Sequence, residues 1–204
     1  MNIYSRAKGT IFAFVALIAL TGRADAQAVT LRGTIESMNG DALVIHTREG
    51  ESATVRLKDG AGVGAVVKAQ LADIKPGLFV GATAVPGRGD ALKALEIHIF
   101  PEAMRGMGAG FHPSDLVAGG SMTNGDISAV VDAVDGQKLT VAYKGGRRTI
   151  LVDKATPIVA LARGAPEDLK PGAGIVLYGA IKGADGGYLA ASAIIGRDGV
   201  KPPM

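Results

Sequence analysis

The sequence contains no cysteine and no tryptophan, and aromatic residues make up only 4% of it. Without cysteine, the chain has no disulfide bond, no thiol nucleophile and no cysteine for lipid attachment. Its core must therefore be held together by the packing of Val, Ile, Leu and Ala. The small number of aromatic rings also leaves little surface for stacking on bases, which argues against binding of single-stranded nucleic acid.

Long apolar runs are missing as well, except for a short one near the start. Arg6 and Lys8 precede ten apolar residues at 11–20, and the small-residue pattern Ala24-Asp25-Ala26 follows. This arrangement is typical of a cleavable secretory signal peptide. Ten helical residues rise only about 15 Å, half the thickness of the hydrocarbon core of a bilayer. We expect residues 1–26 to be a signal peptide, the mature chain to be periplasmic, and no segment to span the membrane.

The positive charge of the chain is concentrated in this leader. Residues 1–26 hold three of the 22 basic residues and one of the 19 acidic ones, so their removal lowers the net charge from +3 to +1. A nearly neutral chain lacks the basic surface of a nucleic-acid-binding protein. We therefore expect no nucleic-acid partner.

From Val29 onward, short stretches of alternating apolar and polar residues are separated by turn signals such as Asn39-Gly40. Alternation of this kind is typical of strands with one face in a core and the other in solvent. Glycine next to Asn or Asp is typical of hairpin turns. The pattern predicts strands at residues 29–36, 43–48, 53–58, 78–85, 91–100, 126–134, 138–143, 148–152, 174–181 and 188–195.

A peptide is repeated within this pattern: Asp73-Ile-Lys-Pro-Gly77 returns as Asp168-Leu-Lys-Pro-Gly172. In both copies three strand patterns and a linking segment come before the turn, and two strand patterns follow. This order predicts an all-β fold of two tandem OB-like β-barrels related by internal duplication, each with about five strands and a short linking helix or turn. We place the barrels at residues 29–100 and 125–196. An open two-sheet sandwich would produce a similar pattern.

The segment between the two predicted barrels, residues 101–124, has five glycines and two prolines. This composition excludes a continuous helix or strand, so we interpret the segment as an inter-domain loop that is either a flexible linker or a functional loop. Residues 197–204 form a polar tail, which we expect to be loose.

The loop and the strand before it suggest a metal site. Imidazole and thioether groups together are the ligands that select copper(I), and they occur here with one carboxylate. The alternative is structural: His98 would lie on the solvent face of a strand, and the methionines would pack a hinge. The candidate ligands are His98, Glu102, Met104, Met107 and His112.

Basic residues on the second and third predicted strands of each unit suggest an interaction face. OB-like barrels bind extended ligands across these strands, so an envelope protein or an anionic polymer would be a suitable partner. An ordinary solvated strand face is the alternative. The residues are Arg48, Arg56 and Lys58 in the first unit and Lys144, Arg147 and Arg148 in the second.

Catalytic signatures are missing from the sequence. No G-x-S-x-G motif places a serine at a nucleophile elbow, and Asp73 and Asp168 are better explained as braces of their turns. We therefore predict no enzyme and no cofactor other than copper. The main hypothesis is a non-catalytic periplasmic binding or interaction module, and the alternative is a periplasmic copper-type metal-binding protein that uses the His/Met loop.

Several peptides resemble those of a family of exported proteobacterial proteins: residues 100–106 (FPEAMRG), residues 121–124 (SMTN), the two Lys-Pro-Gly turns and residues 199–204 (GVKPPM). The resemblance covers essentially the whole predicted mature chain. It implies an exported protein with duplicated small β domains of unknown function. Some members carry the label "metal ABC transporter permease", which does not suit this sequence because a permease needs several membrane-spanning segments.

Overall fold

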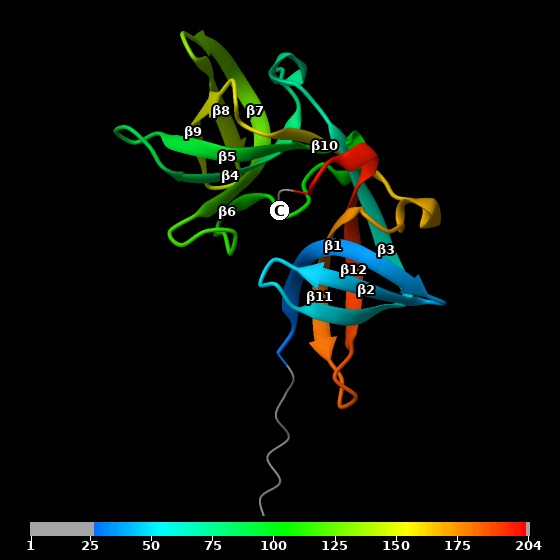
Figure 1. Cartoon of the computed structure of the whole chain (residues 1–204). Coiled ribbons are helices and arrows are strands. Elements are labelled where there is room, and N and C mark those ends of the chain that lie inside the picture. Colours follow the sequence, from blue (N-terminus) through cyan, green and yellow to red (C-terminus); the bar gives the residue numbers. More distant parts are fainter. Residues whose placement is uncertain (1–26, 203–204) are drawn as a thin grey trace, which may run out of the picture.

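The computed structural model describes residues 27–202, in which strands dominate and the only helices are four short 3-10 turns (Figure 1). The predicted signal peptide lies outside the described residues. No helix within residues 27–202 is long and apolar enough to cross a membrane. The strands are β1 (Val29–Asn39), β2 (Ala42–Thr47), β3 (Ser52–Lys68), β4 (Phe79–Pro86), β5 (Leu92–Ile99), β6 (Gly110–Pro113), β7 (Ser121–Ala133), β8 (Gly136–Tyr143), β9 (Gly146–Asp153), β10 (Ile158–Arg163), β11 (Gly174–Lys182) and β12 (Tyr188–Gly196).

Five strands close into a barrel, which we call the first barrel. β1 pairs antiparallel with β2 and β11, β2 pairs with β3, and β11 pairs with β12. β12 then runs parallel to β3 and closes the ring. Since side chains alternate across a strand, one face of each strand fills a core that includes Ile35, Ile45, Val55 and Leu177.

The strands β4, β5, β7, β8 and β9 form a second ring. β7 pairs with β4 and β8, β8 pairs with β9, and β4 pairs with β5. A short parallel contact of β5 with β9, at Leu92 and Lys93, closes it. The interior is a separate apolar cluster that includes Val80, Ile97 and Leu139.

The all-β architecture is confirmed, but the connectivity differs from the prediction of two successive barrels. Residues 29–100 do not close a ring alone, and neither do residues 125–196, because each ring combines three strands of one segment with two of the other. The reason is β3, which does not end near Lys58 but continues to Lys68. It carries the chain out of the first barrel and delivers β4 and β5 to the second ring, while β11 and β12 return to the first (Figure 1).

The repeated Lys-Pro-Gly turns stabilise this exchange of strands. Gly77 donates its amide to the carbonyl of Ile127 at 2.8 Å, and Gly172 donates to the carbonyl of Ile35 at 2.8 Å. Both glycines have positive φ, 87° and 85°, which an L side chain rarely adopts. Each turn therefore binds to the first strand of the opposite half of the chain.

The two rings join along a seam formed by the end of β3 and by β10. These strands pair antiparallel, and β10 also runs parallel to β5. An apolar cluster of Val66, Val159 and Leu161 covers the seam, and Val200 of the C-terminal tail packs against it. Pro202 is buried too, so the described part of the tail is packed against the molecule, and our expectation of a loose tail was wrong.

The segment 101–124 is a folded loop that is bonded to neighbouring elements of the second ring. It contains a 3-10 turn at Glu102–Met104 and the strand β6, and its last four residues are already the start of β7. Arg105 anchors it: the guanidinium contacts Glu102, the carboxylate of Asp126 and, at 3.0 Å, the carbonyl of Gly77. The loop is thereby attached to one of the two repeated turns.

Candidate binding grooves and a buried polar cluster

A buried polar cluster lies on the outer face of the second ring. Ile97 faces the core of the ring, so its neighbours Glu96 and His98 face outward, yet their side chains are only 1% and 2% exposed. Nε2 of His98 lies 2.5 Å from Oε1 of Glu96. Thr83 donates its hydroxyl to the same oxygen at 3.0 Å, while Oε2 of Glu96 has no hydrogen-bond partner.

This cluster has no counterpart in the other half of the chain. In the β4–β5 pair, Glu96 lies opposite Thr83 and His98 opposite Gly81. The corresponding β11–β12 pair places Ser192 opposite Tyr178, and Ile194 opposite Val176. The pair of ionisable groups is therefore specific to one half and is not needed to build a ring of this kind.

The structure does not bring the five predicted metal ligands together. His98 is bound to Glu96, and His112 lies on β6, which is separated from β5 by β7 and β4. Glu102 accepts two hydrogen bonds from Arg105, at 2.6 and 2.7 Å, and these bonds lower the pKa of the Glu102 carboxyl. Met104 is half-buried, and Met107 is 53% exposed. Within residues 27–202, no three His, Cys, Asp or Glu side chains are grouped as a metal site would require.

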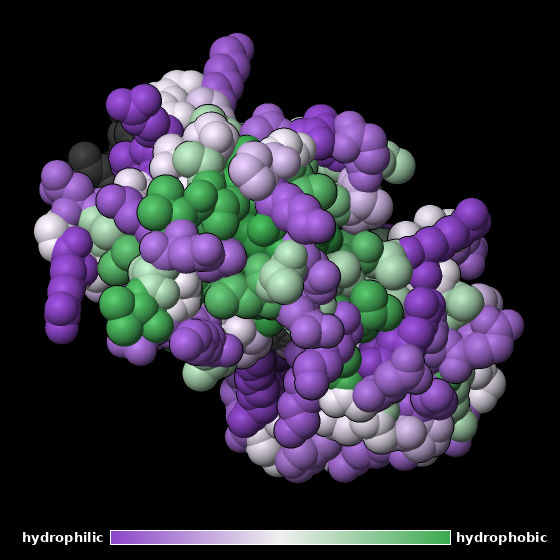
Figure 2. Space-filling model, turned by 90° about the horizontal axis from the view of Figure 1, so that it is seen from above, coloured by the Kyte–Doolittle hydropathy of each residue, from purple (hydrophilic) through white to green (hydrophobic). Residues whose placement is uncertain are grey.

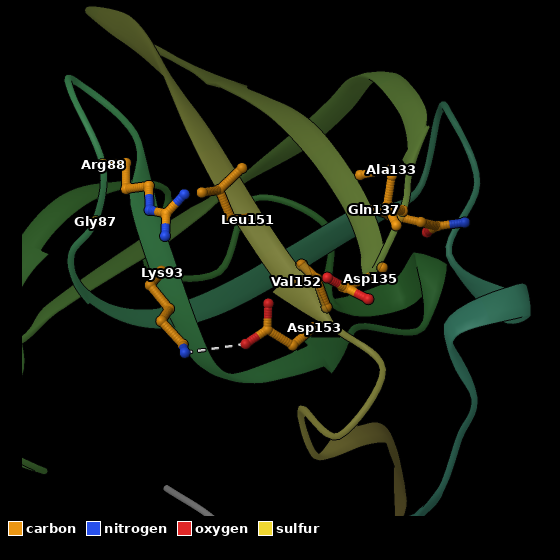
Figure 3. Close-up of a pocket in the computed structure, with 11 residues that line it drawn as sticks. Gly87, Arg88, Lys93, Ala133, Asp135, Gln137, Leu151, Val152 and Asp153 are labelled. Carbon is orange, nitrogen blue, oxygen red and sulfur yellow. Dashed lines mark ion pairs between the residues drawn. The ribbon is translucent and has the colours of Figure 1, made fainter.

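A groove of about 490 Å³ lies at the end of the second ring, between β5, the β7–β8 hairpin and β9 (Figure 3). Its basic groups, Arg88 and Lys93, are balanced by Asp135 and Asp153, and Nζ of Lys93 lies 3.0 Å from Oδ2 of Asp153. The hairpin beside it ends in Val134, which is 91% exposed. Figure 2, which views the molecule from the side of the second ring, shows apolar side chains gathered among polar ones on this face.

A larger groove, of about 1050 Å³, lies at the corresponding end of the first barrel and is named here the barrel groove. It runs between β3 and the β11–β12 hairpin, and both signs of charge line it. The Lys182 ammonium lies 5.6 Å from the centre of the Tyr188 ring, over its face. Its charged lining residues are Glu49, Glu51, Arg56, Lys58, Lys182 and Asp185.

A third groove, of about 740 Å³, lies at the seam between the two rings. The end of β3, the connection from β9 to β10 and the C-terminal tail form its walls. Its charged lining residues are Lys68, Lys154, Asp198 and Lys201.

The six residues of the predicted interaction face do not all lie on one surface. Arg56 and Lys58 line the barrel groove, where Nε of Arg56 lies 3.4 Å from Oδ1 of Asp41, whereas Arg48 lines a different, smaller pocket. In the second ring, Lys144 and Arg147 are exposed near the β8–β9 turn. The Arg148 guanidinium stacks 4.5 Å from the centre of the Phe111 ring, which joins β9 to the loop strand β6.

Two groups have strongly shifted pKa values. Burial raises the pKa of Tyr178 to about 12, and the negative charge of Glu96 adds to this. A hydrogen bond from Arg197 and one from the amide of Ala165 lower the pKa of Asp168 to about 2. Asp168 thus closes the 3-10 turn at Pro166–Asp168, which precedes the Lys-Pro-Gly bend, and does not brace the bend itself as predicted. Its counterpart Asp73 accepts the corresponding amide bond from Gln70 at 2.8 Å.

Sequence reasoning missed several residues of these sites. It placed His98 and Glu96 on a solvated face because the two alternate with core residues, and alternation alone does not show that this outer face is buried. Lys182 and Tyr188 flank a turn signal at Asp185-Gly186-Gly187, and only the strand exchange places that turn beside Arg56. No family model, no curated protein and no solved structure matches this chain.

Proposed function

We propose that the protein is a non-catalytic periplasmic binding module, built from two OB-like barrels that arose by internal duplication and exchanged their last two strands. The repeated turns support duplication, since Gly77 and Gly172 make equivalent bonds to Ile127 and Ile35. The strand order within each ring supports the OB-like assignment: three antiparallel strands, with the fourth beside the first and the fifth closing the ring on the third. Export rests on the signal-peptide pattern of residues 1–26.

The barrel groove is the observation that carries the binding role. OB-like barrels bind extended ligands beside strand three and the loop between strands four and five, and β3 with the β11–β12 hairpin supplies both elements here. The carboxylates of Glu49, Glu51 and Asp185 offset the three basic groups of the groove. A polyanion would meet as much repulsion as attraction in such a groove, whereas a polypeptide offers amides and charges of both signs.

We therefore propose that the ligand is an extended segment of another envelope protein. Tyr188 supplies an amphipathic ring for such contacts, and the apolar side chains of Val29, Leu31 and Leu189 line the same groove. The metal-binding alternative has less support, because the His98 and Glu102 side chains already have partners within the fold.

A photo-cross-linking amino acid placed at Thr54, in the groove, tests the proposal in cells that export the chain. The matched control places the same amino acid at Ser128, an exposed strand position of the second ring. We expect a protease-sensitive adduct from position 54 only, and less of it when Lys58→Glu and Lys182→Glu are combined. A protease-resistant adduct would indicate a polymer other than protein. Equal adducts at both positions, or none at position 54, would contradict a binding role for this groove.

A further inference from the structure

The seam groove differs from the other two large grooves in its charge. Three lysines and one carboxylate line it, whereas basic and acidic groups are equal in number in the barrel groove and in the groove of Figure 3. Among the described residues, the ion pairs include none of the three lysines. Their side chains are exposed, as expected for ammonium groups without a protein partner.

The three lysines come from segments that are distant in the sequence. Lys68 is the last residue of β3 and lies opposite Val159 of β10. Lys154 lies in the connection between β9 and β10, which separates two strands where the first half of the chain has the single long strand β3. Lys201 lies in the C-terminal tail. The fold, and not a local run of basic residues, places them around one groove.

The tail that contributes Lys201 is held in position by close packing. A Cβ on Gly196 would lie 1.5 Å from the carbonyl oxygen of Val200, so only glycine allows the tail to approach β12 this closely. Asp198 adopts φ of 54°, and within residues 27–202 no other non-glycine residue has a positive φ. Strained backbone of this kind persists where its surroundings hold it in place and is concentrated at functional sites.

We propose that the seam groove is an anion-binding site for phosphate-bearing ligands, with Lys68, Lys154 and Lys201 supplying the charge. Lysine ammonium groups bind phosphate as compact point charges with three donors each. Thr156 and Gln70, which also line the groove, add polar groups beside them. The site is independent of the proposed peptide groove, because the two grooves share no residue.

Binding at this place would connect the two rings. Lys68 belongs to the strand that passes between them, and Lys154 follows a strand of the second ring. A ligand that contacts both stabilises the seam in addition to occupying the site, since it binds the folded state alone. We therefore expect an anionic ligand to raise the melting temperature of the whole molecule.

The experiment uses the mature chain, residues 27–204, with two probes: inorganic tripolyphosphate in solution, and vesicles that contain phosphatidylglycerol. The test variant combines Lys68→Gln, Lys154→Gln and Lys201→Gln. The control combines Lys75→Gln, Lys138→Gln and Lys170→Gln, which removes the same charge from exposed positions outside the groove. Calorimetry measures affinity, and amide chemical shifts locate the site.

We expect saturable binding of one of the two probes, at least a tenfold loss of affinity in the test variant and a change of less than twofold in the control. Binding of tripolyphosphate would identify a soluble phosphate ligand, and binding of vesicles alone a lipid headgroup. Amide shifts confined to residues 68–71, 154–159 and 198–201 would place the ligand in the groove. Binding of neither probe, or equal losses in the two variants, would overturn the proposal.

Discussion

Nε2 of His98 lies 2.5 Å from Oε1 of Glu96, and both side chains are almost fully buried on the outer face of the second ring. Removing one partner leaves a buried polar or charged group without compensation, which costs about 3–5 kcal/mol. We expect His98→Leu to lower the free energy of unfolding by that amount in urea titrations.

The corresponding positions of the other half suggest a control for this prediction. The double variant Glu96→Ser, His98→Ile copies Ser192 and Ile194 and removes both members of the pair. Because no buried ionisable group is then left unpaired, we expect the double variant to be more stable than His98→Leu alone. If the double variant is less stable than His98→Leu, the cost of leaving Glu96 unpaired does not explain the loss of stability in the single variant, and the prediction is wrong.

The raised pKa of Tyr178 predicts a loss of stability at high pH. Its pKa is about 12 in the folded protein and about 10 in an unfolded chain. Because the pKa is raised on folding, the folded state is favoured by the neutral phenol, and this contribution to the free energy of unfolding is complete below pH 10. It is lost as the pH rises to about 12, which lowers the free energy of unfolding by an amount on the order of 2 kcal/mol. Measured from pH 8 to 12, the unfolding free energy of the wild type should fall relative to that of Tyr178→Phe, which has no phenol to ionise. A constant difference would contradict burial as the cause.

The lowered pKa of Asp168 predicts the opposite dependence, at low pH. The carboxylate accepts from Arg197 at 2.7 and 2.9 Å, and its pKa is about 2. Its contribution is complete above the unfolded value of about 4 and is lost as the pH falls toward 2. We expect the melting temperature of Arg197→Gln to fall less between pH 5 and pH 2 than that of the wild type. Asp73→Asn is the control, because no ion pair of Asp73 is present within residues 27–202, and it should leave this acid dependence intact.

Two glycines allow the first strand of each half to approach the second closely. A Cβ on Gly33 would lie 2.2 Å from the carbonyl oxygen of His46, and one on Gly125 would lie 2.3 Å from that of Ala142. Backbone atoms cannot move aside as a flexible side chain does, so we expect Gly33→Ala and Gly125→Ala each to cost roughly 2–4 kcal/mol. Gly62→Ala, at a strand position with nothing within 4 Å of the new Cβ, should change the unfolding free energy by less than about 1 kcal/mol. Thermal unfolding of the three variants tests both statements.

Local patterns in the sequence predicted ten of the twelve described strands, missing β6 and β10, and predicted the partners of the strands poorly. Alternation placed the segments around Ile35, Ile45 and Leu177 correctly as strands with a buried face, because that property depends on immediate neighbours. Which strand joins which ring depends on whether β3 turns back near Gly60 or continues, and a glycine is compatible with both. The Lys-Pro-Gly repeat indicated two equivalent turns. It did not indicate that each turn bonds to the first strand of the opposite half of the chain, since equivalent bonds would also form within two successive barrels.

The candidate sites were harder to predict because they depend on that exchange. Arg56 and Lys58 were predicted as part of a strand face; they line a groove whose other wall comes from residues 181–189 of the other half. Lys68, Lys154 and Lys201 are isolated in the sequence and meet only at the seam. His98 was placed in solvent because alternation along a strand does not show what covers its outer face, and the His98 side chain is buried there.

The exchange of strands is the central claim, because the barrel groove and the seam groove both depend on it. Cross-strand NOEs in a chain of residues 27–204 test it most directly. Exchanged strands predict NOEs from Arg32 to Val176 and from Ala82 to Thr123, which are register partners in β1–β11 and β4–β7. Two successive barrels would instead place β1 beside β4 and β7 beside β11. NOEs from Arg32 to residues of β4, with none to β11, would contradict the account.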